Sequence, residues 1–198
     1  MPKVVDHEAR RDELSAIVAG LIASGGLEAA TIREIARSSG YSKGVVEHYF
    51  DDKDELISGA LDWVNRCYEQ RLNRATRGLA GLPALRKMVE ATLPLTERVR
   101  DEWKVRLVFW AAAAIDPTLR RQQSTRLDHA IERYEAHLRS AAERGEINEI
   151  GNYPMAARHL LNITTGICTA ALHQRQRYTK DFLMQEIEYV IERVATEI

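Results

Sequence analysis

The sequence predicts an all-helical protein. Only five of its 198 residues are proline, and no long run of Val, Ile and Thr alternates with polar residues as it would in half-buried strands. Apolar residues instead recur three and four positions apart, which is the spacing of one helix face. The apolar content of 45% and the charged content of 29% are ordinary for a globular chain. A chain of this length has room for one or two small domains with a real core.

Residues 31–56 are predicted to form two short helices that are joined by a tight turn and followed by a third helix. Thr31 and Glu34 have the spacing of a capping box at the start of the first helix. Gly40 suits the end of that helix because glycine tolerates positive φ, and Ser42 can cap the next helix. Each short helix has one apolar face, and the second keeps a polar outer face. This pattern indicates a helix-turn-helix, whose second helix enters the major groove of DNA.

The same stretch resembles the DNA-binding domain of the tetracycline-repressor (TetR) family. That family has an alanine-containing helix, a Gly turn, a recognition helix that ends in an aromatic pair, and then a Lys followed by an acidic residue and Leu. The corresponding residues here are Ile35-Ala36, Gly40, His48-Tyr49-Phe50 and Lys53-Asp54-Glu55-Leu56. The string HYF-x-x-K is similar to the BetI-like branch in particular.

Glu47 departs from the family pattern, which usually has Tyr at this position. A carboxylate there would repel phosphate unless it accepts a hydrogen bond from cytosine N4 or pairs with a basic group of the protein. Charge also gives no support for a nucleic-acid partner, because residues 1–50 carry six Lys and Arg against seven Asp and Glu. Groove contact depends, however, on where the few cations lie.

The resemblance implies which residues contact DNA. Arg33 falls where family members often read a guanine, and Lys43 and Val45 fall at base-edge positions. His48 and Tyr49 fall near the sugar–phosphate, and Thr31 and Lys53 fall at phosphate-anchor positions. For each residue the alternative is a solvated helix face or, for Tyr49, a contact with the core. The expected DNA-binding residues are Thr31, Arg33, Ser42, Lys43, Val45, His48, Tyr49 and Lys53.

Apolar spacing predicts further helices on both sides of this stretch. The helix that starts near residue 51 is roughly 37 Å long and can reach from a DNA-binding head, residues 1–52, into a body, residues 53–198. Pro94 should kink or end its helix, and the run from 105 to 115 is apolar nearly all round, so it should be buried. Arg10 and Arg11 are most often solvated surface charges, with phosphate contact as the alternative. The expected helices cover about 6–24, 51–76, 83–100, 101–115, 117–144, 152–177 and 179 to the end.

The helix expected over 152–177 is apolar over more than one face and therefore needs partners on two sides, and the last expected helix also carries a set of apolar residues. We expect them to pair with their copies in a second subunit, as a four-helix interface, although a monomeric core is the alternative. Recognition helices of a two-fold dimer must reach major grooves about 34 Å apart, which predicts a near-palindromic operator.

The body resembles the family's ligand sensor, so we expect an apolar pocket with a few polar groups. Ordinary core packing is the alternative for each candidate. Several aromatics could form a box for a cationic ligand, and BetI-like members sense choline, so the resemblance includes quaternary amines among the candidate effectors. The candidate effector residues are Trp63, Tyr68, Met88, Trp103, Phe109, Trp110, His159, Asn162 and Thr165.

We therefore predict a DNA-binding repressor that an effector releases by tilting the long helix, with no cofactor, no metal and no enzymatic activity. A helical-bundle enzyme is disfavoured because Glu-x-x-His pairs, phosphate loops and nucleophile motifs are not found. A helical small-molecule binding or interaction protein that has lost DNA binding remains open. The two isolated cysteines and the lack of a signal-length or membrane-spanning apolar run favour the cytoplasm.

Overall fold

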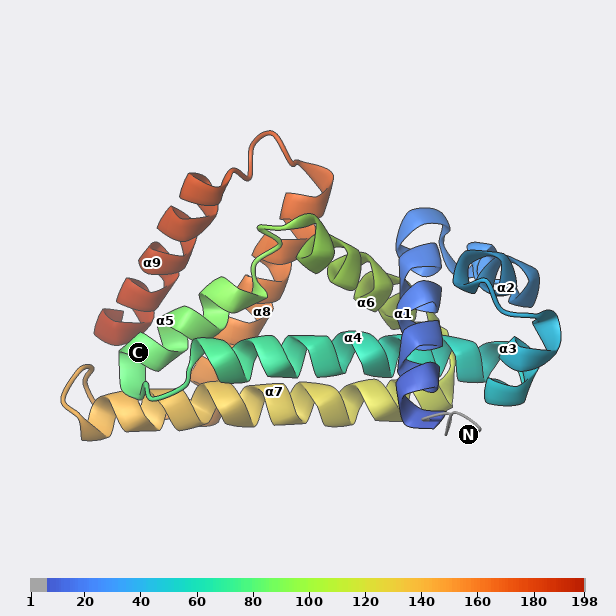
Figure 1. Ribbon diagram of the computed structural model, residues 1–198. Coiled ribbons are helices and arrows are strands. Elements are labelled where there is room, and N and C mark those ends of the chain that lie inside the picture. Colours follow the sequence, from blue (N-terminus) through green and yellow to red (C-terminus); the bar gives the residue numbers. More distant parts are fainter. Residues whose placement is uncertain (1–6, 198) are drawn as a thin grey trace. The chain divides into compact units, whose positions relative to one another are not determined.

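The computed structural model describes residues 7–197, and their side chains up to residue 193. Within this range the chain is all-helical, as predicted, with nine α-helices and one 3-10 turn (Figure 1). Asp6, where the first helix was expected to begin, lies outside the described residues. The helices are α1 (His7–Gly25), α2 (Ile32–Ser39), α3 (Lys43–Tyr49), α4 (Lys53–Ala75), α5 (Gly81–Thr92), α6 (Glu97–Ile115), α7 (Pro117–Glu143), α8 (Tyr153–His173) and α9 (Lys180–Glu197), and the 3-10 turn is η1 (Leu27–Ala29).

Pro94 ends a helix rather than kinking it. The helix that was expected over 83–100 stops at Thr92, and α6 begins at Glu97 instead of residue 101. Leu93, which precedes the proline, is extended with ψ of 141°. A proline ring disfavours the helical conformation of the residue before it, which explains why α5 ends here.

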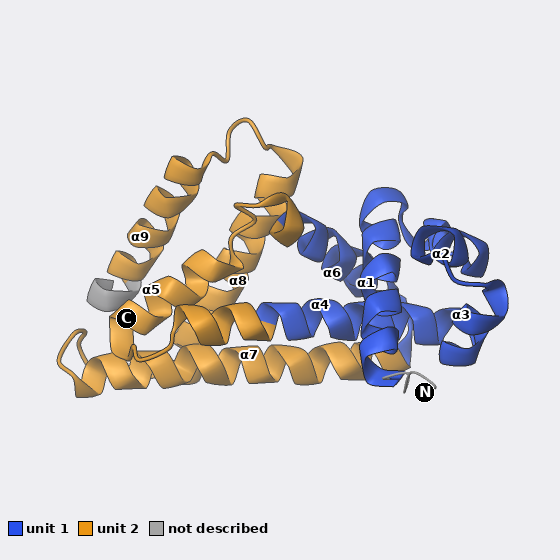
Figure 2. Ribbon diagram, viewed as in Figure 1, with its two compact units in different colours: residues 1–68, 100–117 blue, residues 69–99, 118–198 orange. Residues whose placement is uncertain are grey.

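The chain forms two compact units (Figure 2). The first comprises the described residues up to Tyr68 together with 100–117, and the second comprises 69–99 and the residues from 118 onward. Helix α4 contributes to both units. The expected boundary between residues 52 and 53 stays a prediction, because it concerns which segment binds DNA rather than which segments pack together.

The core of the first unit combines the helix-turn-helix with parts of α1, α4 and α6. Helix α3 has only seven residues and is too short to be stable alone, so packing in this core must hold it. An added Cβ at Gly59 would lie 2.9 Å from the Phe50 ring, so glycine allows the close approach at this point. The buried core side chains are Leu14, Val18, Ala19, Ile22, Ala30, Ile35, Val46, Phe50, Leu56, Ala60, Val64 and Val105.

Helix α6 was expected to be buried on all sides, and this expectation is wrong for its last turns. Val105, Phe109 and Ala113 are buried and lie four residues apart, on one face. Ile115 is 83% exposed, and the alanines at 111 and 114 are also exposed. Alanine presents little apolar surface to water, so an alanine-rich run can leave one face uncovered.

Arg11 connects three segments of the first unit. Its Nη1 donates to the Tyr49 carbonyl at 2.9 Å, and its Nη2 donates to Glu55 Oε1 at 2.6 Å. The guanidinium also lies 5.0 Å from the centre of the Phe50 ring. The expectation that Arg11 is a solvated charge is therefore wrong, because its side chain joins α1 to the end of α3 and the start of α4.

Arg10, which was also expected to be solvated, packs against an aromatic side chain. Its guanidinium lies 4.3 Å from the centre of the Tyr41 ring, and its Nε lies 3.5 Å from Glu13 Oε2. The Tyr41 hydroxyl donates to the same carboxylate at 2.8 Å. Arg10 thereby ties α1 to the turn between α2 and α3.

The second unit has its own apolar core, in which α5 packs against α8 and α9, and α8 against α9. Glu146 Oε2 accepts the Leu82 N–H at 2.6 Å and so links the start of α5 to the segment after α7. No helix within residues 7–197 is long and apolar enough to cross a membrane. Large buried side chains of this unit include Leu85, Met88, Tyr134, Leu138, Leu160 and Ile187.

Removal of the Arg11 guanidinium should make stability less dependent on acid pH. The Asp51 N–H, and then the Arg11 side chain, lower the pKa of the Glu55 carboxyl below its ordinary value. A carboxyl whose pKa is lower in the folded than in the unfolded protein stabilises the fold at pH values above its unfolded pKa of about 4.3. This stabilisation is lost as the pH falls through the folded pKa. We expect Arg11→Met to cost roughly 1 kcal/mol at neutral pH, the scale of one hydrogen bond plus a partly exposed ion pair.

The measurement is urea unfolding of wild type and Arg11→Met at pH 7 and near pH 3. The difference between the two proteins should shrink as the pH falls through the lowered folded pKa of Glu55, because protonation of this carboxyl removes its ion pair with Arg11. Arg37→Met, which breaks an exposed pair within α2, serves as the control and should have the smaller effect at neutral pH. An equal loss at both pH values would show that Glu55 plays no part in the Arg11 contribution.

Candidate nucleic-acid interface and effector site

The local geometry of α2 and α3 is that of a capped helix-turn-helix. The Thr31 side chain accepts the Glu34 N–H at 3.2 Å, and the Ser42 side chain accepts the Val45 N–H at 3.3 Å. Gly40 ends α2 with φ of 72° and ψ of 10°, the left-handed conformation that favours glycine. The structure confirms the two predicted caps and the turn. The reciprocal half of the capping box is not formed, because the Glu34 carboxylate accepts from Arg37 Nε at 3.1 Å and the Thr31 N–H donates to the Ala29 carbonyl at 3.0 Å.

Helix α3 has one face in the core and one in solvent. Val46 is fully buried in the core of the first unit. Lys43, Gly44, Glu47 and His48 are exposed, whereas Val45 and Tyr49 are half-buried. A short helix that offers a polar outer face can enter a major groove, and the predicted division of this helix into two faces is confirmed.

Glu47 pairs with a basic group of the protein, which was one of the two alternatives for this residue. Its Oε1 lies 3.1 Å from Lys43 Nζ, one turn earlier on the same helix. Both side chains remain about half or more exposed, at 68% for Lys43 and 49% for Glu47. The expected base-edge cation is therefore held by an acidic neighbour in this structure.

Lys53, the expected phosphate anchor at the start of α4, also has an acidic partner. Its Nζ lies 2.8 Å from Glu28 Oε1, which belongs to η1. The Asp52 carboxylate accepts the Glu55 N–H at 2.8 Å, so one N–H of this helix terminus is already capped. Arg33 on α2 is exposed, and no ion pair joins it to a carboxylate among the described residues.

Three aromatic rings gather where α1 begins and α3 ends. The ring centres of His7 and His48 lie 5.9 Å apart, and the Tyr49 ring lies 5.6 Å and 5.4 Å from these two rings. Tyr49 also packs partly against the core of the first unit. This residue thus contacts the core while it lies beside the exposed His48, so its two predicted roles are compatible.

The candidate effector residues of the first unit lie around a buried arginine. Trp103 and Trp110 meet edge to face with ring centres 5.8 Å apart. The Arg106 guanidinium lies 4.4 Å from the Tyr68 ring centre and 5.4 Å from the Trp103 ring centre. We call Tyr68, Trp103, Arg106 and Trp110 the Arg106 cluster. Trp63 is half-buried and Phe109 is fully buried in the same unit.

Arg106 and Glu102 were missed by the sequence analysis, although they are only 7% and 2% exposed. The two residues are four positions apart on α6, so they lie on the same side of the helix. Their position among apolar residues was the available signal, because charged residues are rarely buried unless they have partners.

The candidate effector residues of the second unit differ in burial. Met88 is buried in α5 and Thr165 is half-buried on α8. His159 and Asn162 are exposed, so their expected inward orientation is wrong. The buried face of α8 runs through Ala156, Leu160, Thr164 and Cys168, which follow one another at intervals of four residues. His159 and Asn162 do not belong to this series and lie outside the buried face.

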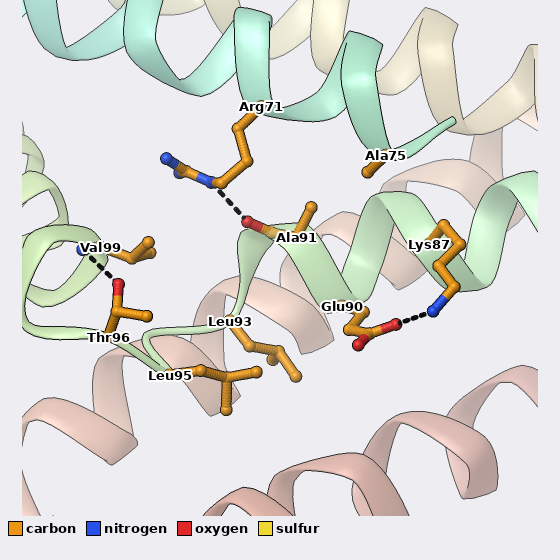
Figure 3. Close-up of a pocket in the computed structure, with 9 residues that line it drawn as sticks. All are labelled: Arg71, Ala75, Lys87, Glu90, Ala91, Leu93, Leu95, Thr96 and Val99. Atoms are coloured by element: carbon orange, nitrogen blue, oxygen red, sulfur yellow. Dashed lines mark hydrogen bonds and ion pairs between the residues drawn. The ribbon is translucent and has the colours of Figure 1, made fainter. Parts of the chain in front are cut away.

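The second unit contains a pocket of about 340 Å³ that none of the nine candidates lines (Figure 3). Arg71 Nε donates to the Ala91 carbonyl at 2.8 Å at one side of the pocket. Lys87 and Glu90 form an ion pair at 2.7 Å at another. The remaining lining is mostly apolar, and the full lining is Arg71, Ala75, Lys87, Glu90, Ala91, Leu93, Leu95, Thr96 and Val99.

No group of three or more His, Cys, Asp or Glu side chains in the described part of the chain could hold a metal ion. The surface of the helix-turn-helix, the Arg106 cluster and the pocket of Figure 3 are candidate sites of other kinds.

Comparison with known proteins covers nearly the whole chain. The model of the BetI-type transcriptional repressor C-terminal domain matches residues 83–196, and the model of bacterial regulatory proteins of the tetR family matches residues 19–60. The regulator PksA of Bacillus subtilis is 25% identical over all of this chain and 95% of its own length. The regulator BetI of Paraburkholderia phytofirmans is 34% identical over 62% of this chain, and the match spans 64% of BetI.

Solved structures show the same fold. A transcriptional regulator from Rhodococcus sp. RHA1 has a TM-score of 0.81 and 27% identity, with coverage of 93% of this chain and 95% of that one. A regulator from Saccharomonospora viridis, solved in complex with choline, has a TM-score of 0.82 and 22% identity, with coverage of 93% and 96%. The capped helix-turn-helix and both family matches lead to one conclusion: the chain belongs to the TetR family of bacterial transcriptional regulators, with a BetI-type repressor domain in its C-terminal part, and is a DNA-binding regulator rather than an enzyme.

Proposed function

We propose that this regulator acts in the cytoplasm as a homodimer that represses transcription from a near-palindromic operator and leaves it when a small molecule binds. The observation that carries the proposal is the exposed outer face of α3, presented by a helix whose other face is fixed in the core. Lys43 and Val45 read base edges, Arg33 reads a guanine from α2, and His48 and Tyr49 lie along the sugar–phosphate. Thr31, Ser42 and Lys53 hold phosphates at the ends of the helices.

Removal of two side chains of α3 should weaken operator binding. Lys43→Ala should reduce affinity about tenfold or more, since a good base-edge contact contributes about 1–3 kcal/mol and the dimer contains it twice. Tyr49→Ala should also reduce affinity, because it removes a contact with the sugar–phosphate. The probe is a duplex selected by wild-type protein from a random pool, and the measurement is fluorescence anisotropy. Lys104→Ala, which removes an exposed cation from α6, is the control.

Unchanged affinity of both variants would rule out α3 as the recognition helix. If wild-type protein selects no sequence from the pool, the alternative function is favoured, namely a helical small-molecule binding or interaction protein that has lost DNA binding.

The proposed dimer interface is the outer face of α8 and α9. Met155, Ile163 and Tyr189 are 55%, 42% and 59% exposed on these two helices. Large apolar side chains that share a helix pair support an interface of a second copy, because such residues are otherwise buried. His159 and Asn162 fall on the same outer side of α8 and would contribute polar contacts. A two-fold dimer would present two copies of α3 to successive major grooves.

A charge placed in this face should separate the subunits. Ile163→Glu and Tyr189→Glu should shift the protein from dimer to monomer in light scattering after size exclusion, because each places two carboxylates in an apolar interface. Operator affinity should fall with the dimer. Leu79→Glu is the control, because Leu79 is an apolar side chain of similar exposure, 42%, that lies outside α8 and α9. This variant should remain a dimer. Dimeric Ile163→Glu and Tyr189→Glu proteins would place the interface elsewhere.

The proposed effector site is the Arg106 cluster together with Trp63 and Phe109. Tyr68 lies on the same helix as Lys53, about 22 Å away along the axis. Val105 on α6 belongs to the core that holds α3, and it directly precedes Arg106 in the chain. An effector that moves these side chains would bias the positions of α4 and α3, which is a population shift toward a form with lower operator affinity.

Choline is the first probe, because the similar Saccharomonospora regulator was solved with it. Arg106 already lies over the Tyr68 and Trp103 rings, so a cationic ligand would meet a like charge there. We therefore expect the uncharged isostere, in which a tert-butyl group replaces trimethylammonium, to bind at least as tightly as choline. All three tryptophans of the chain belong to the proposed site, so intrinsic fluorescence reports binding directly.

The matched variants are Tyr68→Leu in the proposed site and Lys87→Ala in the pocket of Figure 3. Tyr68→Leu should weaken binding of the isostere and its release of operator, whereas Lys87→Ala should not. Choline binding that is tenfold tighter than that of the isostere would contradict the role given to Arg106. Operator affinity that stays constant across a broad ligand panel would contradict the effector proposal.

A further inference from the structure

The cations of the helix-turn-helix region are already matched by carboxylates of the protein. Six Lys and Arg residues lie between residues 7 and 56. Five of them form ion pairs, and Arg33 is the exception among the described residues. The pairs are Arg10–Glu13, Arg11–Glu55, Arg37–Glu34, Lys43–Glu47 and Lys53–Glu28.

Two of these pairs involve the residues that are proposed to contact DNA. Lys43 is held by Glu47 at 3.1 Å, and Lys53 is held by Glu28 at 2.8 Å. Both pairs are exposed, since the side chains of Glu47 and Glu28 are 49% and 88% exposed. Exposed ion pairs contribute little to stability and exchange readily with other partners. The Lys43–Glu47 and Lys53–Glu28 ion pairs must therefore open before the two ammonium groups can bind DNA fully.

Neither pair is explained by the stability of the fold. In an α-helix, an acid followed by a base four residues later is the favourable order, and Lys43 followed by Glu47 is the reverse. Glu28 reaches Lys53 from η1, and most of its side chain is in water. These two carboxylates lie beside the phosphate- and base-contacting groups without a substantial packing role of their own.

The consequence concerns binding to arbitrary sequences. Non-specific affinity comes from cations that neutralise phosphates and release the counterions condensed on DNA. A lysine that already faces a carboxylate gains less from a phosphate, because the carboxylate remains nearby and repels the DNA. At the operator, base contacts that exist only in the correct register can draw the lysines away from the carboxylates and so reduce this loss. The two carboxylates thus weaken a complex that depends on phosphate contacts alone more than they weaken the operator complex.

We propose that Glu28 and Glu47 are specificity-determining residues that suppress binding to non-operator DNA by holding Lys53 and Lys43 in ion pairs. The inference rests on the proposed operator binding through α3. It also accounts for Glu47 at a position where an aromatic residue would be expected, and for a DNA-binding segment whose first fifty residues have no excess of positive charge.

The test compares wild type, Glu28→Gln, Glu47→Gln and the double variant on two duplexes of equal length. One duplex is the operator selected from the random pool, and the other is a scrambled sequence of the same composition. Dissociation constants are measured at several salt concentrations. Glu135→Gln is the control, because it removes one charge from an exposed pair four residues apart on α7 and changes net charge by the same amount.

Each substitution should tighten binding to the scrambled duplex by about fivefold or more at physiological salt, and should steepen the salt slope by about one unit for each phosphate contact that is gained. The operator should gain less, so the ratio of the two affinities falls. The double variant should show the largest fall, and the control should behave as wild type.

Two results would overturn the inference while operator binding stands. One is an unchanged salt slope and affinity ratio in the double variant. The other is a new preferred sequence for Glu47→Gln with unchanged binding to scrambled DNA, which would make Glu47 a reader of cytosine instead. Absence of operator binding by wild type is a separate outcome, which overturns the proposed function on which the inference depends.

Discussion

The first unit depends on one shared core, because α3 has too few residues to form a helix in isolation. Val46 packs this helix into the core, Phe50 directly after it is buried in the same core, and Arg11 of α1 donates to the carbonyl of Tyr49, its last residue. The partners in these contacts belong to other segments of the unit. The orientation of its polar face is therefore a property of the whole unit, and anything that moves α1, α4 or α6 acts on that face.

Charge around α3 is arranged for discrimination rather than for strong attraction. A strongly basic surface would bind any duplex, and genomic DNA offers a vast excess of wrong sites. Here Lys43 pairs with Glu47 of its own helix, and Lys53 at the start of α4 pairs with Glu28 of η1. In the proposed dimer, affinity would come from base contacts and from two heads acting together, and the exposed apolar side chains of α8 and α9 would form its interface.

The sequence predicted what is encoded locally. Caps at Thr31 and Ser42, the turn at Gly40 and the inward side of α3 follow from neighbouring residues and are present. Contacts between distant segments, such as Lys53 with Glu28 or Arg11 with Glu55, leave no periodic trace. For α8, whose apolar residues cover more than one face, periodicity alone did not show that His159 and Asn162 face outward. Buried Arg106 was missed because it follows the charged residues Glu102 and Lys104, so its stretch of α6 resembles a surface face more than a core.

Helix α6 lies far along the chain from the helix-turn-helix, yet its Val105 is part of the same hydrophobic core. A chimera that joins the first fifty-two residues of this regulator to the body of a relative would replace Val105 and its neighbours along with the body. The transplanted head would then meet a surface that did not evolve with it. Exchange of operator preference between relatives is therefore better attempted by grafting the outer positions of α3, or by moving residues 100–117 together with the N-terminal segment.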